Sequence, residues 1–275
     1  MGGLSKKAHL LHAFTREGKT TLVVESGNLL FKTDVVPPTE LAAARIGAAG
    51  VVTAVSRMGA TFAGIGSRDL AGGIDFLRQL HRPPAFHWLS LNLVDAASGQ
   101  PLFSPLLRHQ AGGMRLVVLA VTDHTAFAEP PVGGRVLPWQ QVLREAVARV
   151  ADQADFVLLL SNYSYTENRE IARACPGIDL ILQSGHAAGN LGPIPFDRTL
   201  LAQTNTRGRS LGVLDIAWQG HAPWRETTAG RGSLSGPQPA TFSNRFIAIT
   251  PAVPDDPAID ALVREGLAHG LPAAT

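Results

Sequence analysis

The chain has 275 residues, of which 45% are hydrophobic and 17% charged, a composition typical of a folded, loop-rich globular protein rather than a disordered or fibrous one. The formal net charge is only +2 and the basic residues are scattered, which argues against a nucleic-acid partner. No apolar stretch approaches the roughly 20 residues that a membrane-spanning helix needs, so we predict no membrane span. The single cysteine, Cys175, excludes an internal disulfide and a cysteine-based zinc cluster, and we expect it to be structural.

Helical and strand patterns alternate through the first half of the chain. The predicted elements are a helix over 8–16, a strand over 21–24, an alanine-rich helix over 40–58, a strand over 61–65, a helix over 74–80, a strand over 87–93 and a hairpin within 98–123. The hairpin is predicted to turn at Gly112 and Gly113, because two successive glycines are typical of tight turns.

The second half continues the alternation. The predicted elements are a helix over 139–153, an apolar strand over 156–160, a helix over 168–175, a strand over 180–182, paired strands over 200–205 and 210–218, a strand over 246–249 and a helix over 257–269. Asp255 or Asp256 is expected to cap the last helix, and the Gly-, Ser- and Pro-rich stretch 221–243 is expected to be a loop. Without an internal repeat or a clear boundary, the pattern predicts a single α/β domain over residues 1–275.

Four polar turns each follow a short apolar strand. They are ESGN (25–28), GSRD (66–69), SNYS (161–164) and GHAA (185–188). In open α/β sheets, functional sites gather at the carboxyl ends of the strands, so we expect these turns to face one another across one crevice. The last turn contains His186, which is either a loop histidine without a role or the remnant of a metal-binding turn.

Several segments follow one another in a recognisable order: GGLSKK (2–7), VVESGN (23–28), MGATFAGIGSRDLAGGIDFL (58–77), LSLNL (89–93), LFSPLLRHQAGGMRLVVLAV (102–121), LLLSNYSYTENREIARACPGIDLILQSGHAA (158–188) and LLAQTNTRGRSLGVLDI (200–216). Their order and spacing resemble the calcineurin-like metallophosphoesterases, specifically the bacterial 5'-nucleotidase branch. The resemblance implies a four-layer αββα sandwich. The Asp-x-His strand that opens the family's pattern has no counterpart, so we expect the first strand to be missing.

Members of this family bind two divalent metals, such as Mn²⁺, Zn²⁺ or Mg²⁺, through a bridging Asp completed by Asn, Asp and His. In this chain the matching ligand and catalytic positions are held, in order, by Asn28, Ser67, Arg68, Asp69, Asn162, His186 and Ala188. Asn28 stands in place of the bridging Asp, and Asn162 in place of a strand-end His. By this resemblance His186 alone keeps the family's metal ligand.

Two cations need anionic ligands to offset their charge, whereas these positions are mostly neutral and Arg68 carries a fixed positive charge. We therefore expect no intact catalytic residue and no cofactor. A single weakly bound metal is an alternative, with His186, Asn162 and a weak contribution from Glu25 as its ligands.

Arg68 allows two interpretations. A guanidinium at a strand end, beside the backbone N–H groups of its own turn, suits an oxyanion. The alternative is an ion pair with Asp69, Asp75 or another acidic residue. His124 and His221 are expected to be loop residues, because neither is spaced to form a triad with Ser or Cys.

Two functions remain open. The first is a degenerate metallophosphoesterase-like domain that is catalytically impaired and binds a small anion or a protein partner, or serves as a scaffold. The second is an active 5'-nucleotidase-like hydrolase with an unusual site and a truncated N-terminus. No C-terminal nucleotide-binding domain is expected. As written, the sequence predicts a cytoplasmic protein, because His9 and His12 interrupt the apolar N-terminal segment. A true start upstream with a signal peptide would make the protein periplasmic or extracytoplasmic.

Overall fold

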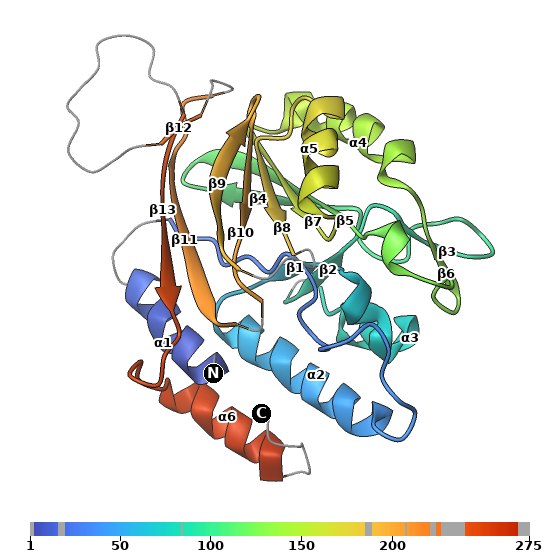
Figure 1. Ribbon diagram of the computed structural model, residues 1–275, viewed down its shortest axis with the longest axis vertical. Helices are drawn as coiled ribbons and strands as arrows, with labels where there is room; N and C mark the ends of the chain where they lie inside the picture. The colour runs from blue at the N-terminus through green and yellow to red at the C-terminus, as the bar shows by residue number, and fades with distance from the viewer. Residues whose placement is uncertain are drawn as a thin grey trace.

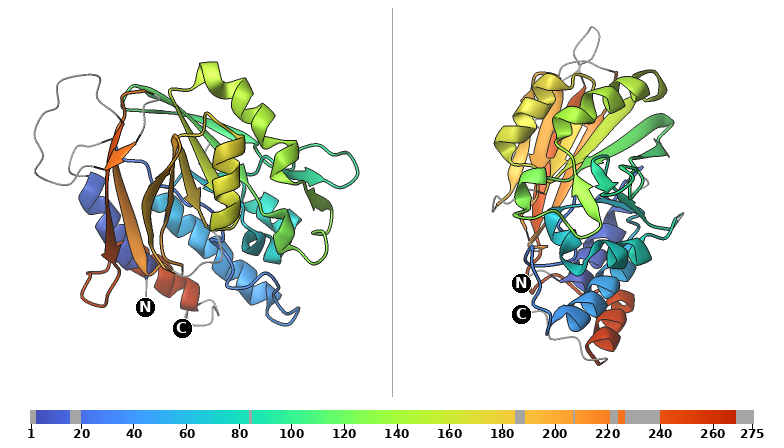
Figure 2. Two further views of the ribbon diagram at one scale, coloured as in Figure 1. Left: turned by 45° about the horizontal axis from the view of Figure 1, so that its top comes forward. Right: turned by 90° about the vertical axis from the view of Figure 1, so that its right-hand side faces the viewer.

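The structure is a computed structural model, and it describes residues 3–15, 20–83, 85–184, 189–206, 208–220, 224–226 and 240–268. The elements stack as a helical layer, two β layers and a second helical layer (Figures 1 and 2). This arrangement confirms the predicted αββα sandwich. None of the helices in the described ranges combines the length and the apolar character that crossing a bilayer requires.

A mixed six-stranded sheet forms the first β layer. In spatial order its strands are β4 (Leu106–Ala111), β5 (Met114–Val121), β7 (Phe156–Ser161), β8 (Leu180–Gln183), β10 (Thr199–Gln203) and β9 (Leu191–Phe196). The inner strands run parallel, and the edge strands β4 and β9 are antiparallel to their neighbours. Strand β7 is buried along its whole length, as an inner strand covered on both faces must be.

Successive side chains of the inner strands enter two different cores. Leu119 and Leu159 face the helical layer, whereas Val118 and Leu158 face the second β layer. The helices over the first face are α4 (Leu143–Val150) and α5 (Tyr165–Ala174), flanked by the short helices η2 (His124–Ala126), η3 (Trp139–Gln141) and η4 (Ala151–Gln153). The predicted helix over 139–153 is thus an α-helix with a 3₁₀ turn at each end.

The second β layer consists of separate small sheets. Its strands are β1 (Phe62–Gly64) and β2 (His87–Leu89) in one sheet, and β11 (Ser210–Ala217), β13 (Thr241–Ala248) and β12 (Arg225–Glu226) in another. Phe62, Trp224 and Phe242 from this layer share a core with Leu158 of the six-stranded sheet. A further antiparallel pair joins β3 (Leu93–Asp95) to β6 (Gly134–Val136).

Four α-helices and one 3₁₀ helix cover the outer face of the second β layer (Figure 1). They are α1 (Leu4–Thr15), α2 (Leu41–Arg57), η1 (Ser67–Gly72), α3 (Ile74–Leu80) and α6 (Pro257–Ala268). Asp256 caps α6, because its carboxylate accepts hydrogen bonds from the backbone N–H groups of Ala258 at 3.1 Å and Ile259 at 3.0 Å.

Several predicted elements differ in the structure. Residues 21–24 do not form a strand, although the next residue makes a single bridge to Ala63. The predicted strand over 87–93 divides into β2 and β3, which belong to different sheets. The stretch 221–243 is not wholly a loop, because it contains β12 and the first residues of β13.

The predicted pairing of 200–205 with 210–218 is wrong. Strand β10 lies between β8 and β9 in the six-stranded sheet, whereas β11 pairs with β13 in the second layer. The physical reason lies in burial: β10 is buried at every position and needs cover on both faces, while most of β11 is only half-buried. A short connection between two apolar segments therefore did not mean a hairpin.

Candidate functional site

The described parts of the polar turns meet at one edge of the sandwich. The backbone N–H of Ser184, at the end of β8, donates to the carbonyl of Ser161 at the end of β7 at 2.8 Å. The amide Nδ2 of Asn28 donates to the Ser184 carbonyl at 2.9 Å, and the N–H of Ser67 donates to Oδ1 of Asn162 at 2.9 Å. We refer to Asn28, Ser67, Arg68, Asn162 and Ser184 as the turn cluster. The GHAA turn, with His186 and Ala188, lies outside the described residues.

Asn28 is held by close packing against the GSRD turn. Its backbone adopts the left-handed conformation, with φ 56°, and its Oδ1 accepts a hydrogen bond from the N–H of Arg68 at 3.1 Å. A Cβ atom on Gly66 would lie 2.3 Å from this Oδ1, so no other residue fits there without a shift. Both polar atoms of the Asn28 side chain, Nδ2 and Oδ1, are thus hydrogen-bonded to neighbouring backbone groups.

Asp69 supports the turn cluster from inside the protein. Its buried carboxylate accepts hydrogen bonds from the backbone N–H groups of Asn28 and Leu29, both at 2.7 Å, and of Leu30 and Gly66, both at 2.9 Å. Burial nevertheless raises the pKa of Asp69 to about 6, because desolvation outweighs the four hydrogen bonds. These bonds tie the ESGN turn to the GSRD turn, so Asp69 orders the backbone of the site.

Asp34 contacts the turn cluster from the segment that follows ESGN. Its Oδ1 accepts a hydrogen bond from the Ser67 hydroxyl at 2.6 Å, and its Oδ2 lies 3.8 Å from Nε of Arg68. The sequence indicates Arg68 as an ion-pairing residue but does not identify Asp34 as its partner. No motif includes Asp34, and its spacing from Asn28 carries no signal, so the structure alone places it at the site.

Three buried polar atoms of the turn cluster have no hydrogen-bond partner among the described residues. They are Nε of Arg68, Nδ2 of Asn162 and Oγ of Ser184. Asn162 is only 1% exposed. Two of these atoms are N–H donors and the third is a hydroxyl, which also donates. Leaving a buried donor unpaired costs about 1–3 kcal/mol, so the set is suited to an incoming hydrogen-bond acceptor.

The described residues do not fit a two-metal centre. No group of three or more His, Cys, Asp or Glu side chains in the described ranges is arranged to hold a metal ion. The Asn28 and Asn162 oxygens already accept hydrogen bonds from backbone N–H groups. Glu25, considered as a weak ligand, forms an ion pair with Lys7 instead. The free donors and the Arg68 charge at this site would repel a cation rather than bind it.

The other residues considered from the sequence do not join the turn cluster. His124 lies in η2, and its Nδ1 is 2.9 Å from the hydroxyl of Tyr163, whose pKa is raised by burial. Cys175 is buried and unpaired by a disulfide, and burial raises the pKa of its thiol to about 11, which fits the structural role expected of it. His221 lies outside the described residues.

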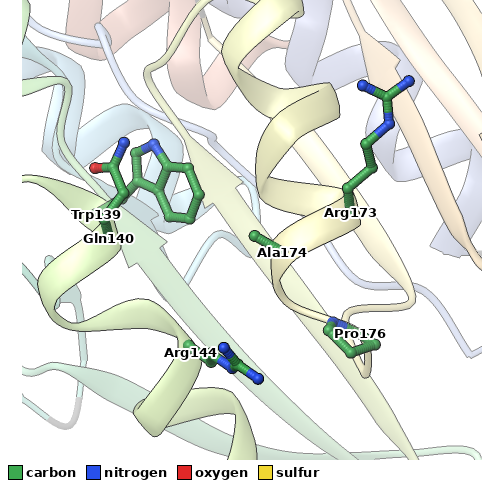
Figure 3. A pocket seen from close by; sticks show the side chains of 6 residues that line it. All are labelled: Trp139, Gln140, Arg144, Arg173, Ala174 and Pro176. Carbon is green, nitrogen blue, oxygen red and sulfur yellow. The ribbon is translucent and has the colours of Figure 1, made fainter.

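A cavity of about 440 Å³ lies apart from the turn cluster, on the helical layer (Figure 3). Its lining is Trp139, Gln140, Arg144, Arg173, Ala174 and Pro176, and none of these belongs to the turn cluster. Figure 3 shows Arg173 and Ala174 on α5, Pro176 in the turn after it, and the other three side chains on the neighbouring helical segment. The guanidinium of Arg173 is already bonded to Glu170 at 2.7 Å. Arg144 lines this cavity and is a cationic residue outside the turn cluster, so Arg144→Ala can serve as the control for Arg68→Ala.

No model of a known protein family matches the chain. In sequence, 207 residues are 28% identical to the uncharacterized metallophosphoesterase YunD of Bacillus subtilis (strain 168), over 73% of this chain and 43% of YunD. Two Thermus thermophilus structures, each covering 98% of this chain, are similar: the sulfate thiohydrolase SoxB (TM-score 0.76, 22% identity, 47% of its chain) and a 5'-nucleotidase precursor (TM-score 0.74, 18% identity, 53% of its chain).

The calcineurin-like phosphoesterase YfkN of Bacillus subtilis is similar over 98% of this chain and 90% of its own, with a TM-score of 0.72 and 14% identity. The chain therefore has the calcineurin-like metallophosphoesterase fold, and the resemblance read from its motifs is confirmed. Its structural neighbours include 5'-nucleotidases, and it spans about half the length of the nucleotidase precursor, 53%, and less of YunD, 43%.

These comparisons correct one expectation. From the sequence we predicted no cofactor, but the proteins that the chain resembles are metallophosphoesterases and 5'-nucleotidases, which use divalent metals. The expectation rested on substituted ligand positions, and those substitutions do not decide whether a metal binds. His186, which matches a metal-ligand position of the family, lies outside the described residues.

Proposed function

We propose that this chain is a degenerate metallophosphoesterase-like domain, impaired in two-metal hydrolysis, which binds a small oxyanion at the turn cluster. The observation that carries the proposal is the set of buried donor atoms on Arg68, Asn162 and Ser184 that find no hydrogen-bond partner within the described ranges. An anion with several oxygens would satisfy these donors. A fully paired, purely structural turn would not leave them free.

Impaired hydrolysis follows from the chemistry of the substituted positions. Two-metal catalysis uses the cations to activate a water nucleophile and to stabilise the charge that develops on the phosphoryl oxygens. At Asn28 the bridging carboxylate is absent, and Arg68 brings a positive charge to a position where the family has a histidine. Losing even one electrostatic stabiliser typically slows an enzyme by about 10²–10³-fold. Several substitutions in one centre should therefore reduce turnover to the background rate.

Anion binding follows from charge and hydrogen bonding together. Arg68 presents a guanidinium that stays ionised and whose side chain is 28% exposed, so a ligand from solvent can reach it. Charge-assisted hydrogen bonds to an oxyanion are roughly twice as strong as neutral ones. The Asn162 amide and the Ser184 hydroxyl would add neutral donors on the buried side of the site.

Thermal unfolding with inorganic phosphate tests the binding proposal. A ligand that binds only the folded state stabilises it by about 2.7 kcal/mol at one hundred times its Kd. For a chain of this size, that corresponds to a rise in melting temperature of about 5 °C. We expect Arg68→Ala to abolish the rise and Arg144→Ala, in the separate cavity, to keep it. Equal responses in both variants would show that phosphate binds elsewhere or unspecifically.

Hydrolysis is measured with 5'-AMP and p-nitrophenyl phosphate in the presence of Mn²⁺, Zn²⁺ or Mg²⁺. We expect rates equal to those of buffer with metal. The second candidate function, an active metal-dependent phosphoester hydrolase, is favoured by the relationship to a metallophosphoesterase. It predicts turnover that disappears in His186→Ala and persists in His9→Ala, a variant of an exposed histidine on α1. That result would replace the degenerate interpretation with the hydrolase.

A further inference from the structure

Asp34 already places an anionic group at the turn cluster. Its carboxylate accepts the Ser67 hydroxyl at 2.6 Å and lies 3.8 Å from Nε of Arg68. Ser67 and Arg68 are connected through direct hydrogen bonds to Asn162 and Asn28, which belong to the same cluster. The protein thus supplies its own negative group at the place where an external oxyanion would meet Ser67 and Arg68.

The contact made by Asp34 is incomplete. At 3.8 Å the Arg68 Nε is within ion-pair range but beyond hydrogen-bond distance, and this atom remains without a hydrogen-bond partner among the described residues. In the part of the chain that the structure describes, the Asn162 and Ser184 donors have no partner either. A planar carboxylate with two oxygens therefore pairs with one hydroxyl and leaves three donors of the cluster free.

Asp34 lies on a segment that is exposed to solvent. Its side chain is 40% exposed, and the next residue, Val35, is 77% exposed. Moving such a side chain into solvent breaks one hydrogen bond and one partly solvated ion pair, and pairs of this kind contribute little to stability. Asp34 can therefore leave the cluster without disturbing the buried Asp69 beneath it.

We infer that Asp34 is an internal competitor for the anion site, so that an anion binds there by displacing the Asp34 carboxylate, and a tetrahedral anion with more acceptor oxygens than a carboxylate, such as inorganic phosphate, displaces it best. The inference rests on the proposed anion-binding function. A tetrahedral anion offers four oxygens, enough for Ser67, Arg68, Asn162 and Ser184 together. A monocarboxylate ligand offers two oxygens, no more than Asp34 already provides, and has no advantage in displacing it.

The test is calorimetric titration of wild-type protein, Asp34→Asn and Asp75→Asn with inorganic phosphate and with acetate, at constant ionic strength. Asp75 is exposed on α3, so its variant removes the same unit of negative charge without touching the turn cluster. Removing a competing charge should tighten phosphate binding about three- to tenfold in Asp34→Asn and leave Asp75→Asn like wild type. Acetate should bind wild type at least tenfold more weakly than phosphate.

The outcomes separate the two proposals. If wild type and Asp34→Asn both show no saturable binding of phosphate, the anion-binding function fails. If both bind phosphate equally, the function stands and the inference about Asp34 is overturned. Weaker binding by Asp34→Asn, or an equal gain in Asp75→Asn, also overturns the inference, because Asp34 would then be part of the ligand site or act only through net charge. Melting temperatures without ligand confirm that the variants are folded.

Discussion

Two buried asparagines in the segment after β7 occupy opposite situations. Asn168 belongs to a closed network: it accepts from the Ser161 hydroxyl at 2.6 Å and donates to the Tyr163 carbonyl at 3.0 Å and to Oε1 of Gln183 at 3.1 Å. Asn162 accepts from the Ser67 N–H, but its Nδ2 has no partner among the described residues. Both side chains are almost fully buried.

The comparison separates polar side chains that stabilise the fold by bonding to one another from polar side chains whose donors have no partner among the described residues. The Asn168 network continues from Gln183 to Gln203 at 2.6 Å and from Gln203 to the Gly189 carbonyl at 3.0 Å, so its members satisfy one another. Such networks hold the ends of neighbouring strands in place. The turn cluster is built on these strand ends, and three of its buried donors have no hydrogen-bond partner among the described residues. Rigid support beneath unsatisfied donors is the arrangement expected of a binding site.

The largest effect is expected when the closed network is opened. Asn168→Ala leaves the Ser161 hydroxyl and the Gln183 oxygen buried without their partner, and each such group costs about 1–3 kcal/mol. We expect the free energy of unfolding in urea to fall by about 4 kcal/mol. Asn190→Ala, which changes an exposed asparagine outside this network, is the control; its hydrogen bonds to Asn205 and Ser210 are solvent-exposed, so it should cost no more than about 1 kcal/mol. A loss below 1 kcal/mol in Asn168→Ala would contradict the structural role given to the network.

The pH dependence of Asp69 gives the next largest effect. Burial raises its pKa from 3.8 to about 6, so the folded protein binds this proton more tightly than the unfolded chain. Its contribution is fully present below about pH 4 and is lost as the pH rises to about 6, a decrease of about 3 kcal/mol in the free energy of unfolding. Asp69→Asn, which mimics the protonated carboxyl, should lack this decrease. Parallel pH profiles for the two proteins would show that Asp69 does not titrate in this range.

The sequence predicts the layers of this fold well because burial leaves a direct pattern. The apolar run of β7, the glycine turn between β4 and β5, and the helix α3 lie where they are predicted. The pairing of β10 was not predictable from neighbouring residues, since its partner β8 is set by which strand can be covered on both faces. Sheet order is a property of the packed molecule, and adjacency along the chain does not determine it.

The candidate site, like the fold, has parts that the sequence predicts and parts that it does not. The positions of Asn28, Arg68 and Asn162 follow from motifs, because strand ends of parallel sheets gather at one edge. The contact of Asp34 with the turn cluster was not predictable, because an exposed carboxylate in a loop has no periodicity or spacing that indicates its partners. The free donors are equally invisible in sequence: Asn162 and Asn168 are the same residue type in the same segment, and only their neighbours distinguish them.

The smallest change in stability is expected for Asn162→Ala, and it makes the comparison with Asn168 direct. The variant leaves the buried Ser67 N–H without its acceptor, which costs about 1–3 kcal/mol, but it also removes a buried Asn162 donor that has no partner among the described residues, which relieves a cost of similar size. These contributions oppose each other, so the free energy of unfolding without ligand should change by less than about 1 kcal/mol. The rise in melting temperature caused by phosphate should nevertheless become smaller than in wild type, because one donor to the anion is gone. If Asn162→Ala destabilises the protein as much as Asn168→Ala and leaves the phosphate response intact, Asn162 is a structural residue and its free donor does not mark a ligand site.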